Sequence, residues 1–170
     1  MRKIIPILLL LFLKFTNTSA QNILIGASGN ISFNQSEITI SEAGEDYSSS
    51  IEALNPLYIN VVYNDDWNKR GNSPMNKWKI EIYKSDLSWH PDLMLETKRT
   101  GEGNQLDRRG KPYVQDGENY QLITNNPAYF FKGRGEFENI PVNFRISGAS
   151  LTMGAETFET SVIFTVYDEW

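Results

Sequence analysis

Apolar side chains at every second position are the feature of this sequence that most restricts its fold. A period of two is typical of a β-strand with one buried side and one solvent-facing side. The longest such stretches lie at residues 22–33 and 157–167, and shorter ones lie at residues 57–63, 78–82 and 142–146. Helical periodicity is nearly absent, and so is the alternation of strands and helices that builds parallel sheets. The pattern therefore predicts an all-β chain.

Turn-forming residues separate these stretches and set the expected architecture. Roughly eight or nine short strands, divided by segments rich in Gly, Pro, Asn and Asp, are typical of an antiparallel sandwich. We find no internal repeat, no low-complexity tract and no linker that would divide the chain. The sequence therefore predicts a single antiparallel immunoglobulin-like β-sandwich.

The first 20 residues differ from the rest. Arg2 and Lys3 precede an apolar run at positions 4–13, and a polar stretch follows that ends in small residues at Ala20. A charged start, a short apolar core and small residues before a cleavage point are typical of a secretory signal peptide. A membrane-spanning helix needs about 20 apolar residues, so the run is too short to be an anchor. We predict a signal peptide at residues 1–20, a β-sandwich domain at residues 21–170, and no integral membrane span after cleavage.

Charge and cysteine content restrict the function of the exported domain. Three of the 16 basic residues lie in the predicted signal peptide and all 21 acidic residues lie outside it, which leaves 13 basic residues and a formal charge of −8. An acidic domain repels phosphate backbones, so we expect no nucleic-acid partner. The chain has no Cys, which excludes thiol catalysis, thiolate metal sites and stabilisation by disulfides. We expect no cofactor.

Catalytic and metal-binding patterns are weak. His90 is the only histidine, and it lies near Ser88 and Asp86, so a Ser/His/Asp hydrolase is one hypothesis. The Gly-x-Ser-x-Gly motif that would expose a nucleophile is absent. Residues 64–75 begin like a calcium loop, but Lys69 stands where such a loop needs Gly and position 75 is Met, where it needs Glu. We therefore predict a non-enzymatic protein without catalytic or metal-ligating residues.

Tryptophan positions offer a second functional hypothesis. Trp67 lies in a polar connection among Asp and Asn residues, where an exposed aromatic ring can stack on a sugar. We expect Trp78 and Trp89 to pack in the core or at strand ends. Trp67 is therefore the candidate ligand contact if the domain binds a glycan.

The strands at the two ends of the chain suggest assembly. An edge strand has unpaired backbone groups and invites addition of a strand from another chain. Residues 22–33 have the alternation that a donated strand needs, and their centre is small. The alternative is an ordinary first strand paired within its own domain. The candidate donor residues are Ile23, Ile25, Ala27, Gly29, Ile31 and Phe33.

The end of the chain resembles a known group of proteins. The sequence GASLTMGAETF at residues 148–158, followed by TSVIFTV at residues 160–166, is similar to the ending of spore-coat-U-like and pilin-like exported bacterial proteins. In those proteins a short strand, a Gly-containing turn and an alternating last strand close the domain. The resemblance covers about the last quarter of the chain. It implies an immunoglobulin-like sandwich in a surface structure, and it brings no catalytic residues.

Together these observations predict an exported, non-enzymatic structural or adhesive surface protein. We expect it in the periplasm, on the outer surface or outside the cell. Its expected partners are other copies of itself or related surface subunits, joined by strand addition as in pilin-like assemblies. The alternative is a carbohydrate- or ligand-binding module at the cell surface, with a glycan as the partner.

Overall fold

The computed structural model describes residues 23–33, 50–63, 77–106, 111–149 and 157–169. All regular elements within these ranges are β-strands, and none of the described residues forms a helix long and apolar enough to span a membrane. The strands are β1 (Ile23–Ser28), β2 (Ser50–Glu52), β3 (Leu57–Tyr63), β4 (Lys77–Ser88), β5 (Met94–Arg99), β6 (Asn104–Gln105), β7 (Tyr113–Gln115), β8 (Gln121–Leu122), β9 (Ala128–Arg134), β10 (Phe137–Ser147) and β11 (Glu159–Glu169).

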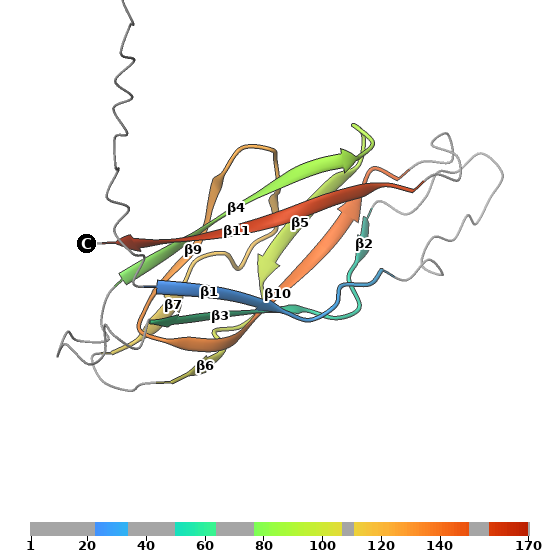
Figure 1. Ribbon diagram of the computed structural model, residues 1–170. Helices are drawn as coiled ribbons and strands as arrows, with labels where there is room; N and C mark the ends of the chain where they lie inside the picture. The colour runs from blue at the N-terminus through green and yellow to red at the C-terminus, as the bar shows by residue number, and fades with distance from the viewer. Residues whose placement is uncertain (1–22, 34–49, 64–76, 107–110, 150–156, 170) are drawn as a thin grey trace, which may run out of the picture.

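The strands form two antiparallel sheets that pack face to face (Figure 1). The first sheet has the order β1-β3-β10-β5-β8, and β2 and β6 also pair with β10. The second sheet has the order β11-β4-β9-β7. The predicted fold class, an all-β antiparallel sandwich, is confirmed.

Strand β4 illustrates how the alternating sequence produces the two faces of a sheet. Trp78, Ile80 and Ile82 are almost completely buried on its inner side, whereas Lys79 and Glu81 lie on the outer side and pair there, with 3.0 Å between the Lys79 Nζ and a Glu81 carboxylate oxygen. Side chains alternate between the faces of a strand, so one apolar set supplies the core and one charged set faces water.

Trp78 lies at the centre of the core. Its ring contacts the rings of Phe131 and Phe137 edge to face, with centroid distances of 6.0 and 6.5 Å. The indole N–H donates a 2.7 Å hydrogen bond to the Gly135 carbonyl, so its one buried polar atom is paired. Gly133 leaves room for the ring, because a Cβ there would lie 2.4 Å from Trp78 Cζ2. The predicted burial of Trp78 is confirmed.

The first alternating stretch of the sequence is divided in the structure. β1 pairs with β3 of the same chain over six residue pairs, from Ile23 opposite Tyr63 to Ser28 opposite Tyr58. The chain then leaves the sheet, and Phe33 makes an isolated bridge with Ala53. In this structure the segment is thus an ordinary first strand with a non-strand continuation.

Candidate functional site

β1 and β11 lie next to one another along one side of the sandwich. Each is the last strand of its own sheet, since β1 pairs only with β3 and β11 pairs only with β4 in the described part of the chain. Figure 1 shows them in blue and red, running along the same side of the molecule. The two sheets therefore meet there at two strand edges.

The contact between these edge strands is tight at one end and open at the other. Ile23 on β1 and Val166 on β11 are 1% and 2% exposed. Further along, Val162 and Phe164 are only partly buried although they lie on the same face of β11 as Val166. On the neighbouring strand β4, the inner side chains from Trp78 to Ile82 are all buried. Part of the inner face of β11 thus lacks the cover that a neighbouring strand would give.

An apolar groove occupies the open end. It encloses about 350 Å³ between β11, the chain after β1, and the inner side of the first sheet. Apolar and aromatic side chains form most of its wall, which is typical of sites that bind apolar ligands. The lining residues are Ile31, Phe33, Trp89, Leu95, Phe144, Ile146, Phe158, Glu159, Thr160 and Val162.

The opposite side of the sandwich is closed by the chain itself. Residues 116–120 lead directly from β7, the edge of the second sheet, to β8, the edge of the first. Arg99, only 3% exposed, holds this connection by donating hydrogen bonds to the carbonyl of Asp116 (2.9 Å) and the carboxylate of Glu118 (3.0 Å). Val114 on β7 and Ile123 directly after β8 are both buried. The groove therefore marks one side of the sandwich and not both.

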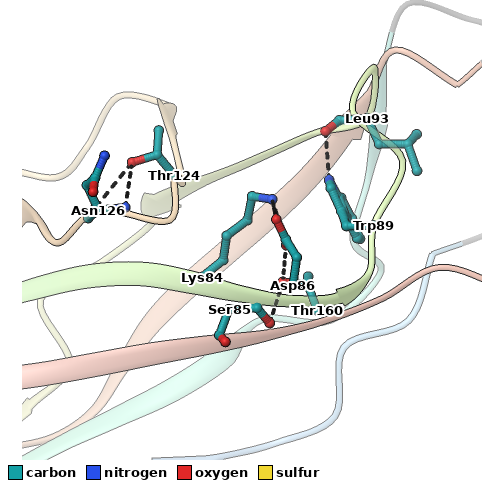
Figure 2. Close-up of polar contacts among 8 residues, drawn as sticks. All are labelled: Lys84, Ser85, Asp86, Trp89, Leu93, Thr124, Asn126 and Thr160. Carbon is teal, nitrogen blue, oxygen red and sulfur yellow. Dashed lines mark hydrogen bonds and ion pairs between the residues drawn. The ribbon is translucent and has the colours of Figure 1, made fainter.

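Two residues of the groove lining, Trp89 and Thr160, also contact a polar cluster (Figure 2). Lys84 lies on the inner face of β4, and its ammonium donates to both carboxylate oxygens of Asp86 at 2.7 and 2.6 Å. The Thr160 hydroxyl on β11 donates to the same carboxylate at 2.7 Å. Partial burial alone would raise the pKa of Asp86, but hydrogen bonds from Lys84, Thr160 and Asn125 outweigh it and lower this pKa.

Trp89 joins this cluster to the groove. Its ring lies beneath the Lys84 ammonium, 5.2 Å from the ring centroid, within the range of a cation–π contact. Its indole N–H donates a 2.8 Å hydrogen bond to the Leu93 carbonyl, which fixes the ring against the turn after β4. Because Trp89 also lines the groove, the charged pair and the apolar wall share one side chain.

The six candidate donor residues do not have equivalent environments. Ile23 is buried and Ile25 is partly buried against the core, whereas Ala27 and Gly29 are exposed. Ile31 and Phe33 line the groove. The structure thus divides this set into two residues packed in or against the core, two exposed residues and two residues that line the groove.

The other residues singled out from the sequence have different outcomes. His90 accepts a 3.3 Å hydrogen bond from the Asp92 backbone N–H, and its ring packs edge to face on Phe158 at the groove, 5.8 Å between centroids. These contacts connect His90 to a turn and to the groove wall. Trp67 and the calcium-like segment lie outside the described residues.

Sequence reasoning did not identify the groove. The sequence pattern places its wall residues in separate strands and turns, and it predicts for Trp89 only packing in the core or at a strand end. The signal that could have indicated the site is Lys84, a charged residue in phase with Trp78, Ile80 and Ile82. A charge at a predicted inner position indicates either a pairing partner or an incomplete core.

Comparisons with known proteins give little further information. No family model and no curated protein matches this chain. A solved structure described as "Crystal structure of the P pilus rod subunit PapA" aligns with 82% of this chain and 99% of its own, at 17% identity and a TM-score of 0.35. A superposition this loose does not establish a shared fold.

Proposed function

We propose that this chain is an exported, non-enzymatic structural subunit of a surface assembly, and that the groove between β11 and the chain after β1 receives an extended strand from another subunit. The observation that carries the proposal is the partly exposed inner face of β11 beside an apolar groove. An added strand would pair its backbone with an edge strand and bury every second side chain in the groove.

The lining of the groove defines the chemistry of the incoming segment. Eight of the ten lining residues are apolar or aromatic, and Glu159 and Thr160 are the exceptions. A segment with apolar side chains at alternate positions fits this wall, because alternate side chains of a strand point to one face. A soluble polar loop or a flat sugar ring would leave most of the wall exposed to water.

Residues 22–33 of a second copy supply such a segment. In this structure β1 pairs with β3 of its own chain, so donation requires β1 to leave that pairing. Few side chains attach β1 to its own domain. Ile23 is the only fully buried side chain of β1, and the last three residues of the strand are exposed. A copy that has donated β1 also exposes the edge of β3, which widens its own receiving site.

A covalently locked chain makes the test specific. Replacing Gly26 and Asn60 by Cys in the chain from Gln21 to Trp170 should fix β1 to β3 through one disulfide, so that an added peptide cannot simply displace β1. The probe is a fluorescent synthetic peptide of residues 22–33. We expect it to bind the oxidised locked chain, and binding is read by fluorescence anisotropy.

A matched pair of variants on β11 locates the site. Val162→Glu places a charge in the groove and should reduce peptide binding at least about tenfold, since an unpaired carboxylate beside apolar groups is costly. Ser161→Glu adds the same charge on the exposed outer face and should bind like the parent. Far-ultraviolet circular dichroism checks that both variants are folded. Absence of binding to the parent, or equal binding by both variants, would show that the groove is not a strand-receiving site.

A further inference from the structure

Among the aromatic residues of the groove wall, Trp89 has a charged group over its ring. Trp89 lines the groove, and the Lys84 ammonium lies 5.2 Å from its ring centroid. We propose that Trp89 selects an aromatic side chain from the incoming strand, and that the Lys84–Asp86 pair positions Trp89 for this contact. This inference rests on the proposed strand-receiving role of the groove and adds the side-chain preference of the partner.

The composition of the wall around Trp89 favours an aromatic occupant. Phe33, Phe144 and Phe158 line the same groove as Trp89. Aromatic rings prefer offset or edge-to-face contacts with one another, and such contacts add to the gain from burying their area. An aliphatic side chain would gain the burial alone.

The Lys84–Asp86 ion pair contacts the Trp89 ring through the Lys84 ammonium. The Lys84 side chain is 10% exposed, and its ammonium reaches both oxygens of the Asp86 carboxylate. Thr160, itself a lining residue, donates to that carboxylate from the neighbouring strand. The pair therefore connects β4, β11 and Trp89 at one point of the wall.

The structure offers a matched control for this pair. Lys79 and Glu81 have the same spacing on the same strand, β4, and pair at 3.0 Å on the outer face. Neither of them lines the groove. Removing Lys79 should therefore change the charge of the chain by the same amount without affecting the groove.

The test compares two peptides on the oxidised locked chain: residues 22–33, and the same peptide with Phe33→Leu, which keeps most of the apolar area and removes the aromatic ring. Phe33 is the single aromatic residue of that segment. We expect the parent chain to bind the Phe33 peptide about five- to tenfold more tightly than the Phe33→Leu peptide. Trp89→Leu and Lys84→Met should reduce this ratio to about twofold or less, and Lys79→Met should preserve it. A ratio between two peptides is insensitive to a uniform loss of stability, so a merely structural role would not change it.

Each result decides a separate point. Equal binding of both peptides by the parent would overturn the aromatic preference while leaving the groove as a strand site. If neither peptide binds the parent chain, the proposed function itself is overturned. A preserved ratio in Lys84→Met would remove the positioning role of the pair, and Asp86→Asn provides the same measurement if Lys84→Met does not fold.

Discussion

Gly26 on β1 lies opposite Asn60 on β3, and a Cβ at position 26 would lie 4.0 Å from the Asn60 Cβ. This separation falls within the range of about 3.5–4.5 Å that a disulfide requires. The chain has no native Cys, so two introduced thiols can pair only with each other or with another copy. The pair therefore reports directly whether β1 stays in its own domain.

Oxidised Gly26→Cys/Asn60→Cys should be more stable than its reduced form. The disulfide closes a loop of about 35 residues, for which the chain-entropy model gives roughly 3–4 kcal/mol. Urea unfolding with and without reductant measures the difference.

The same lock tests whether β1 is the donated strand. Under the proposal, the oxidised chain stays monomeric by light scattering, and reduction restores assembly. Equal assembly of the oxidised and reduced chains would show that another segment is donated.

Asp168→Asn should stabilise the protein at pH 7. One Asp168 carboxylate oxygen is buried without a hydrogen-bond partner among the described residues, and burial raises the pKa of this carboxyl. A folded-state pKa above the unfolded value means that the ionised form opposes folding, so stability rises as pH falls through the folded pKa. We expect a gain of about 1 kcal/mol at pH 7 that shrinks on acidification. A loss of stability at pH 7 would indicate a stabilising partner for the carboxylate.

Asp86→Asn, one strand away, should have the opposite effect. Hydrogen bonds from Lys84, Thr160 and Asn125 lower the pKa of Asp86 despite its partial desolvation. A lowered folded-state pKa contributes stability above the unfolded pKa of about 3.9, and this stability is lost as pH falls through the folded pKa. Because Asp86 is exposed and water screens its contacts, we expect Asp86→Asn to cost only about 0.5–1 kcal/mol at pH 7, with the difference from the parent closing in acid. Urea unfolding at several pH values tests both Asp variants, and a pH-independent difference would contradict this explanation.

Gly133→Ala should destabilise the core strongly. The added Cβ would lie 2.4 Å from Trp78 Cζ2 and 2.7 Å from the Tyr113 carbonyl oxygen, so a fully buried ring or the backbone must move. Overpacking of this kind costs about 1–3 kcal/mol. Gly26→Ala is the control, because its Cβ would meet nothing closer than 4.0 Å. Similar melting temperatures for the two variants would mean that Trp78 can shift freely.

Part of this structure could be predicted from local sequence because side-chain alternation depends only on the strand itself. The stretch from Trp78 to Ile82 carries its own inner and outer faces, and the last alternating stretch corresponds to β11, shifted by two residues from the expected 157–167 to Glu159–Glu169. The buried position of Trp78 follows from the same alternation.

The groove could not be predicted, because it depends on which strands become neighbours. β1 pairs with β3, about 35 residues away in sequence, and β11 pairs with β4. The open side exists only because β1 and β11 become the neighbouring edges of the two sheets. Nothing local to Ile31 or Val162 indicates that they share a wall. The single-residue hypotheses at His90 and Trp67 could not indicate this site either, since it is formed by many ordinary apolar side chains.

The most direct test of the central claim is amide hydrogen exchange of the oxidised locked chain with and without the peptide of residues 22–33. If the peptide adds as a strand at the open edge, alternate backbone amides of β11 gain protection, and those of β7 and β8 on the closed side do not change. Protection of β7 or β8, or binding without any protection along β11, would contradict the account.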